Sequence, residues 1–296
     1  AKNVEGIIID LRNNPGGSLE EVARMLGQVI KSGPVVQIRD GNGNVSVFED
    51  NDGDAQTYAG PLAILVNLAS ASASEIYSAA IQDYERGVVI GSTTTGKGTA
   101  QVQLDSLAYG QATLTQRKFY RVTGGSTQNK GVIPDIKLVD IYDEEFGERK
   151  AKNALKWDTI PTAPFKREGS IQPYVTKLAQ LSTQRVSKDP QFNYLETRKS
   201  IAQETKDQKR TVLDIDQRKA EILALEKQTL DAENKRRAAT GLKPYANWET
   251  YQASLDALSE SRAKMKATQR PPLPEEEAFV NEAMNVLLDY SKLQGK

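Results

Sequence analysis

The stretch from Leu62 to Tyr84, LAILVNLASASASEIYSAAIQDY, decides the fold of the first half of the chain. Its opening run, Leu62–Asn67, is short and mostly apolar, which is typical of a strand buried on both faces of a sheet. A helix is predicted over Ser72–Tyr84, because Ser72 and Glu75 have the spacing of a capping box. A buried strand that leads directly into a helix is the repeating unit of an α/β sheet.

The segments on either side of this stretch repeat the pattern. A helix is predicted after Ser18, where apolar residues recur at helical spacing. After Gly98, apolar and polar residues alternate as they do in strands and hairpins. Further strands are predicted at Val4–Leu11, Pro34–Asp40, Asn44–Phe48 and Arg86–Gly91. We therefore expect an α/β fold, with a mixed sheet and helices packed on it.

The chain changes character after this α/β part. Residues 1–140 are predicted to form the α/β core, residues 141–164 a linker, and residues 165–296 an all-α C-terminal domain. In the last segment apolar residues recur at helical spacing, and more than half of all charged residues fall there. We interpret these charges, which are of mixed sign, as solvated helix faces.

The composition limits the chemistry that the chain can perform. It has no histidine and no cysteine, so Ser-His-Asp and Cys-His catalysis and thiolate metal sites are excluded, and lysine is the remaining candidate base. The 39 basic and 39 acidic residues give zero net charge, without the basic excess of a nucleic-acid-binding protein. Mean hydropathy is −0.55. No apolar run approaches the roughly 20 residues that span a bilayer.

Ser72 is the first candidate for a catalytic role. A serine at a helix N-terminus lies beside unpaired backbone N–H groups and the positive end of the helix dipole. The N–H of Ala73 could then stabilise an oxyanion formed when the Ser72 hydroxyl attacks a carbonyl. The plain structural alternative is that Ser72 only caps the helix, and the spacing alone leaves Ser70 and Ser74 as competing nucleophiles.

Lys97 lies in a glycine-bracketed turn and allows two interpretations. The segment Gly91–Thr99 nearly matches the phosphate-binding pattern G-x-x-x-x-G-K-[ST], but a phosphate loop must open a helix, and the following residues alternate like a strand. The other interpretation makes Lys97 a general base whose pKa is lowered by burial, with Gln101 positioned to hold its amine. An exposed lysine in a polar turn is the simplest alternative.

The turn Asn14–Gly17 ends the first predicted strand, at the edge where α/β sheets usually bind ligands. It is either a simple strand-to-helix connection or the source of a second oxyanion donor, the N–H of Gly17.

Taken together, these segments resemble the C-terminal processing peptidase family, and in particular its tail-specific members of the Gram-negative periplasm. The resemblance is carried by Asp10–Gly17, Ser70–Glu75, Gly96–Gln101, and Lys118–Val122 followed by Gly131–Asp135. It implies a serine protease core of the ClpP/crotonase-like kind and a Ser-Lys dyad. Within that dyad Ser72 is the nucleophile, Lys97 the general base and Gln101 the residue that orients the lysine. The oxyanion hole is assigned to the backbone N–H groups of Gly17 and Ala73.

The resemblance also implies ATP-independent endoproteolysis, with no metal and no cofactor. The implied partners are polypeptides with accessible C-termini, selected by their tails, and an envelope adaptor protein is a candidate partner. Nucleic acid is not expected as a partner, and the implied location is the periplasm. Two alternatives from other classes stay open: a phosphate-loop nucleotide-binding protein, and a non-catalytic scaffold built on a peptidase fold.

Two departures from the family pattern shape these expectations. Ser92–Thr95 stands where the family has Glu-Pro-Thr-Phe, which predicts a more polar wall beside Lys97. Family members also carry an N-terminal helical region and a PDZ domain before the first strand, whereas this sequence reaches its first predicted strand at Val4. We therefore expect the chain to be a fragment that folds but has little proteolytic activity by itself.

Overall fold

The computed structural model describes residues 4–50, 55–104, 107, 109–141, 146–266 and 269–295. By compactness the chain divides into two units, Ala1–Ser182 with Glu282–Lys296, and Thr183–Asn281. The predicted limits of core, linker and helical domain, at residues 140 and 164, stay a prediction. A mixed α/β core followed by a helical region confirms the predicted fold class.

The first unit contains a parallel sheet of four strands. Its strands are predominantly apolar and its two central ones are buried along their whole length, as the continuous apolar runs predict. Their order across the sheet is β1 (Ile7–Asp10), β4 (Leu62–Val66), β5 (Val88–Gly91) and β8 (Ile136–Lys137). Because the strands are parallel, the carboxyl ends of β1, β4 and β5 lie next to one another at one edge.

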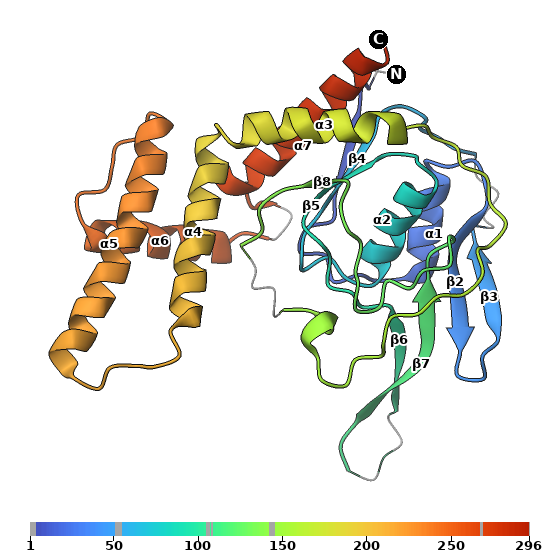
Figure 1. Cartoon of the computed structure of the whole chain (residues 1–296), viewed down its shortest axis with the longest axis horizontal. Helices are drawn as coiled ribbons and strands as arrows, with labels where there is room; N and C mark the ends of the chain where they lie inside the picture. Colours follow the sequence, from blue (N-terminus) through green and yellow to red (C-terminus); the bar gives the residue numbers. More distant parts are fainter. Residues whose placement is uncertain are drawn as a thin grey trace. The chain divides into compact units, whose positions relative to one another are not determined.

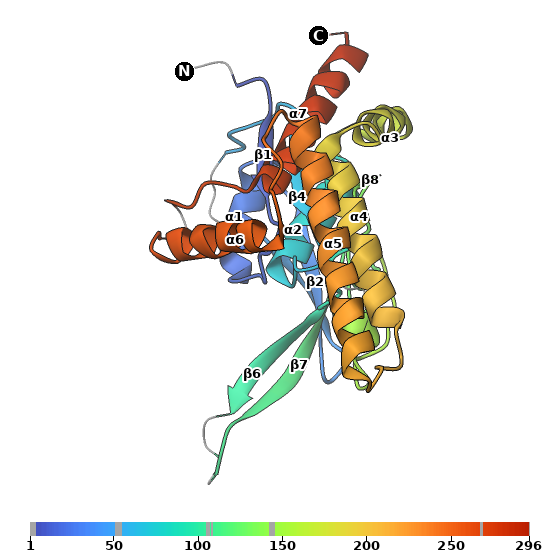
Figure 2. The same ribbon diagram turned by 90° about the vertical axis from the view of Figure 1, so that its left-hand side faces the viewer.

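A second sheet of four strands is antiparallel. Its order is β3 (Val45–Glu49), β2 (Pro34–Asp40), β7 (Ala112–Tyr120) and β6 (Thr99–Leu104). Strands β2 and β3, which correspond to the predicted strands Pro34–Asp40 and Asn44–Phe48, form a hairpin, and β2 also pairs with the end of β7. Figure 2 shows β6 and β7 extending as a long arm away from α1 and α2. A bulge between Ala100 and Gln101 interrupts their register.

Two helices, α1 (Leu19–Gly27) and α2 (Ala73–Asp83), complete the core. Helix α2 contacts β5 of the parallel sheet and β2 of the antiparallel sheet, so it lies between the two sheets (Figure 1). Consequently every residue of α2 except Gln82 is buried. Helix α1 is amphipathic and buries Ala23 and Leu26 against this core.

Helices account for most of the chain after residue 165. They are α3 (Gln172–Val186), α4 (Pro190–Asp207), α5 (Ile215–Ala239), α6 (Trp248–Ala263) and α7 (Pro274–Leu293). Asp189, Asp214 and Asn247 cap α4, α5 and α6 through their side chains. Within the first unit, the C-terminal part of α7 packs on α3 through the rings of Tyr290 and Tyr174. None of the described helices is both long and apolar enough to cross a membrane.

Candidate active site

The ends of three parallel strands bring the predicted site segments to one edge of the sheet. Strand β1 leads into the turn Asn14–Gly17, β4 leads into the segment that carries Ser72, and β5 leads into the loop that carries Lys97. The first two segments are tied together, since Asn14 O accepts hydrogen bonds from the N–H of Ala71 at 3.0 Å and from the hydroxyl of Ser74 at 3.1 Å. This edge is where open α/β sheets bind ligands.

Ser72 occupies a strained position immediately before α2. Its φ of 55° and ψ of −115° lie outside the regions that non-glycine residues favour, and such strained conformations cluster at functional sites. One half of the predicted capping box is formed, since the carboxylate of Glu75 accepts a hydrogen bond from Ser72 N–H at 2.9 Å, whereas the Ser72 hydroxyl makes no capping hydrogen bond. Ser72 is only half-buried. Its place beside the N-terminus of α2 puts it next to the positive end of the helix dipole.

The structure separates Ser72 from the two competing serines. Ser70 is fully buried, and its hydroxyl donates to Leu11 O at 2.7 Å and accepts from Asn67 N–H at 2.9 Å. Ser74 is 4% exposed, and its hydroxyl donates to the Asn14 carbonyl. Both hydroxyls therefore hold neighbouring loops in place, and Ser72 is the member of the three that solvent can reach.

Gly16 allows the turn after β1 to approach Ser72. It has a φ of 103°, and an added Cβ would lie 2.8 Å from Ser72 Cβ and 2.9 Å from Ala73 N. Gly16 N–H is occupied by the side chain of Asn14 at 2.9 Å. The N–H groups of Gly17 and Ala73 have no acceptor among the described residues, and Gly17 is exposed. A turn packed this closely against Ser72 can present N–H groups to a bound carbonyl.

One buried carboxylate joins the Ser72 and Lys97 segments. Oε2 of Glu75 accepts hydrogen bonds from Ser72 N–H and from Lys97 N–H, each at 2.9 Å, so the two backbone nitrogens lie within two hydrogen-bond lengths of each other. Oε1 accepts from Gly96 N–H at 2.7 Å and from the hydroxyl of Thr94. Burial raises the pKa of the Glu75 carboxyl above its ordinary value, and these hydrogen bonds partly oppose the shift.

Lys97 is half-buried, and its side-chain amine forms no ion pair with a carboxylate in the described part of the chain. It lies in the loop 92–98 between β5 and β6, and the loop packs closely at Gly96, where an added Cβ would lie 2.9 Å from the carbonyl carbon of Asn129. The residues after it form strand β6. The helix that a phosphate-binding loop requires is therefore not the element that follows Lys97.

The polar side chains before Lys97 form hydrogen bonds to residues outside the loop. The hydroxyls of Ser92, Thr94 and Thr95 donate to Asp140, Glu75 and the Leu68 carbonyl respectively. These side chains thus fix the loop rather than standing free beside the amine.

The hydrogen bond recorded for the Gln101 side chain goes to a residue other than Lys97. Gln101 is exposed on β6, and its Nε2 donates to Thr115 Oγ1 on the neighbouring strand at 3.3 Å. A bulge interrupts the strand between Ala100 and Gln101.

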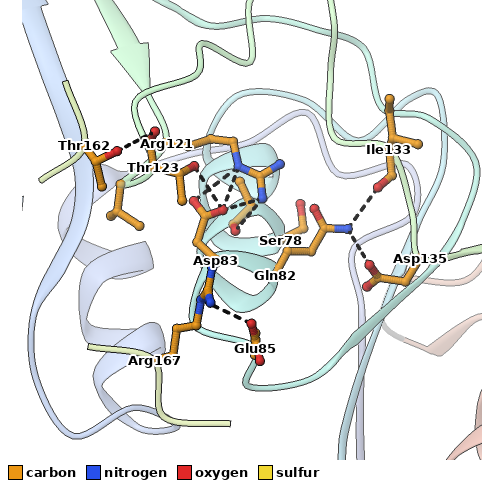
Figure 3. A network of polar contacts seen from close by, with 12 residues as sticks. Ser78, Gln82, Asp83, Glu85, Arg121, Thr123, Ile133, Asp135, Thr162 and Arg167 are labelled. Carbon is orange, nitrogen blue, oxygen red and sulfur yellow. Dashed lines mark hydrogen bonds and ion pairs between the residues drawn. The ribbon is translucent and has the colours of Figure 1, made fainter. Parts of the chain in front are cut away.

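An ion pair that no local sequence pattern predicts anchors the far end of α2 (Figure 3). Asp83, 7% exposed, accepts from Nη2 of Arg121 at 2.6 Å and from the hydroxyl of Thr123 at 3.2 Å. Beside it, Gln82 donates to Asp135 at 3.1 Å. Arg121 and Asp135 both lie in motifs that carry the family resemblance, and these motifs are the feature of the sequence that could have pointed to the two residues. Helix α2, which begins directly after Ser72, is thereby held at both ends.

No three carboxylate, imidazole or thiol groups gather as a metal site in the part of the chain that the structure describes. The site therefore offers a serine, a lysine, a buried carboxylate and unpaired backbone N–H groups. This set can attack a carbonyl, move a proton and stabilise an oxyanion.

Comparison with known proteins agrees with this chemistry. A model of peptidase family S41 matches residues 1–138, and a model of the C-terminal domain of tail specific protease matches residues 141–292. The tail-specific protease of Haemophilus influenzae is 43% identical over 233 residues, which cover 74% of this chain and 33% of that protein. The carboxy-terminal-processing protease of Bartonella bacilliformis is 34% identical over 161 residues, covering 52% of this chain and 37% of that protein.

Among solved structures, a photosystem II D1 C-terminal processing protease is 32% identical, with a TM-score of 0.42, over 46% of this chain and 35% of that one. This chain spans about a third of the length of the curated relatives it matches.

Proposed function

Because the chain belongs to the tail-specific proteases of peptidase family S41, we propose that it carries the catalytic site of an ATP-independent serine endopeptidase. Ser72 is the nucleophile and Lys97 the general base. The observation that supports this assignment most strongly is the shared carboxylate of Glu75, which binds the backbone N–H groups of both residues with one oxygen. The proposal requires that the side chains of these two segments meet in the space beside the Asn14–Gly17 turn.

The proposed reaction uses the groups of this site in two steps. The Ser72 hydroxyl attacks the scissile carbonyl while its proton passes to the neutral amine of Lys97, and the oxyanion is stabilised by the N–H groups of Ala73 and Gly17. The lysine returns the proton to the leaving amine, and an acyl-enzyme remains. Lys97 then activates the water that hydrolyses the acyl-enzyme. If Gln101 orients the lysine, its amide has to exchange Thr115 for the amine.

Several further features of the function are proposals from the family alone. They are the selection of substrates by their C-terminal tails, a periplasmic location and an envelope adaptor as partner. We also propose that residues 1–296 alone have little activity, since a preorganised site must exclude water around the lysine. A comparison of this chain with the complete protein on one unfolded substrate, with and without an apolar C-terminal tail, tests both points. Tail-dependent turnover by residues 1–296 at the rate of the complete protein would contradict them.

The dyad is tested by intact mass after treating the complete protein with an active-site serine probe. We expect one adduct, which Ser72→Ala abolishes and Ser74→Ala, the matched control from the same helix turn, retains. Ser72→Ala and Lys97→Ala should each remove nearly all cleavage, and the double variant should be little worse than either single variant, because nucleophile and base act as a unit. A folded protein that neither reacts with the probe nor cleaves would be a scaffold. Stabilisation by ATP in a thermal melt would support the nucleotide-binding alternative.

A further inference from the structure

A short segment far along the chain packs against the loop that carries Lys97. This segment is the single 3-10 turn η1 (Glu148–Lys150), the lime-green turn of Figure 1. Its contacts are made to the carbonyl groups of the loop. The N–H of Glu148 donates to Thr95 O at 3.1 Å, and Nη2 of Arg149 donates to Thr94 O at 2.9 Å.

The same turn reaches the residue on the other side of Lys97 through one buried amide. Gln128, 1% exposed, accepts a hydrogen bond from Gly98 N–H at 2.8 Å through its oxygen. Through its nitrogen it donates to the Glu148 carboxylate at 3.2 Å. Glu148 and Arg149 therefore contact the loop on both sides of Lys97, directly before it and through Gln128 after it.

These contacts matter because the loop has no regular structure of its own. Residues 93–98 belong to no helix or strand, so their conformation depends on hydrogen bonds to other parts of the fold. The N–H groups of Gly96 and Lys97 are held by Glu75. The carbonyls of Thr94 and Thr95 are held by η1. Loss of η1 would leave the carbonyls of Thr94 and Thr95 without these donors, whereas Gly96 O and Gly98 O would keep their hydrogen bonds from Asn129 N–H and Phe119 N–H.

Arg149 shows features of a group dedicated to this contact. It is half-buried, and its guanidinium has no carboxylate partner among the described residues. Its buried Nε has no hydrogen-bond partner, so the donation to Thr94 O is the polar contact that the structure records for this side chain. A hydrogen bond from a charged donor is stronger and more directional than one between neutral groups.

We propose that Glu148 and Arg149 are positioning residues that hold the Lys97 loop in its reactive conformation, an inference that rests on the proposed role of Lys97 as base. Both residues lie in the segment matched by the tail-specific protease C-terminal domain, outside the segment matched by the S41 peptidase model. The C-terminal region of the chain thus supplies part of the support of the peptidase site. A base that is displaced by about 1 Å loses about 10²-fold in rate.

The test compares variants of the complete protein on an unfolded protein substrate. Arg149→Ala should lower kcat by about 10- to 100-fold and leave KM within about twofold, because the loop acts on the chemical step. Labelling of Ser72 by the serine probe should slow in parallel. Arg149→Lys should recover part of kcat, since an ammonium can still donate to the Thr94 carbonyl. Lys150→Ala, an exposed neighbour in the same turn, is the matched control and should behave as wild type.

A pair exchange tests the other contact. Gln128→Glu alone places two carboxylates against each other and should lower kcat. Combining it with Glu148→Gln restores one hydrogen bond and keeps an acceptor for Gly98 N–H, so kcat should recover.

Thermal melts of every variant separate positioning from unfolding. Wild-type kcat in folded Arg149→Ala and Gln128→Glu, or an activity loss that only follows the loss of folded protein, would overturn the inference. The activity of Lys97→Ala distinguishes the two proposals. If that variant is active, the proposed base is wrong and the inference fails with it. If it is inactive while Arg149→Ala keeps wild-type kcat, only the positioning role is wrong.

Discussion

Replacing Glu75 by glutamine tests whether one buried carboxylate organises the site. The carboxylate is fully buried and accepts four hydrogen bonds, two on each oxygen. Glutamine has nearly the same shape but only one acceptor oxygen, and its amide nitrogen is a donor. In the better of its two orientations, the amide oxygen faces the N–H groups of Ser72 and Lys97. The amide nitrogen then faces Gly96 N–H and the hydroxyl of Thr94.

The magnitude follows from counting the groups that lose an acceptor. The Thr94 hydroxyl oxygen already accepts from Val132 N–H; it can also accept from the new amide, but its own proton loses its acceptor. Gly96 N–H remains buried and unpaired, which costs about 1–3 kcal/mol. The N–H groups of Ser72 and Lys97 exchange a charged acceptor for a neutral one, at about 1 kcal/mol each. An amide is cheaper to bury than a carboxylate, which offsets part of this sum. We expect Glu75→Gln to lower the free energy of unfolding by about 2–4 kcal/mol.

A single fluorescent reporter can measure this loss in the unit that contains the site. The chain has two tryptophans, Trp157 in the first unit and Trp248 in the second. Urea unfolding in a Trp248→Phe background therefore reports on the first unit alone. Glu21→Gln, an exposed glutamate of α1, is the control and should change the stability by less than about 0.5 kcal/mol.

The second readout is the rate of Ser72 labelling under conditions where Glu75→Gln is still folded. We expect a fall of about 10²-fold, because both reacting segments lose their common anchor. A stability within about 0.5 kcal/mol of wild type, together with an unchanged labelling rate, would refute the reasoning that Glu75 holds the two segments in register.

Three further predictions concern the turn, the base and the acid stability of the fold. Gly16→Ala should lower the free energy of unfolding by about 1–3 kcal/mol through backbone strain, and it should slow acylation of Ser72. The reason is that the added Cβ would lie within 3 Å of Ser72 and Ala73 atoms. A wild-type kcat together with wild-type stability in urea would contradict this prediction. Lys97→Arg should be inactive because arginine remains charged and cannot accept the Ser72 proton. Cleavage by folded Lys97→Arg at a rate near that of the wild-type protein would contradict a lysine base. Burial opposes ionisation of Asp158, but hydrogen bonds from Lys118 and Arg39 outweigh it and lower the pKa of that carboxyl. The stability that the ionised carboxyl contributes is therefore present above the unfolded-state pKa and is lost as pH falls through the folded-state pKa. Urea unfolding across pH should show Asp158→Asn to be less stable than wild type at neutral pH and similar to it in strong acid.

The local elements were accessible from the sequence because they depend on neighbouring residues. The apolar run at Leu62–Val66 is buried along its length, and the capping pattern at Ser72 begins α2. The alternating residues after Gly98 form strand β6, so the element after Lys97 is not the helix that a phosphate loop needs. The absence of histidine and cysteine excludes whole catalytic classes by composition alone. Each of these inferences rests on spacing within a few residues or on composition.

What required the tertiary structure is the set of contacts between residues far apart in the chain. Ser70, Ser72 and Ser74 have nearly the same local sequence, yet packing buries the first and third against the β1 turn and leaves Ser72 accessible. Glu75 looks like an ordinary helix cap, and only the fold brings Gly96 and Lys97 to its carboxylate.

The contact of Arg149 with Thr94 spans 55 residues and leaves no local pattern in the sequence. Burial and hydrogen-bond partners at such separations depend on how the sheets and loops pack, and a periodicity of two or 3.6 residues carries no information about that packing.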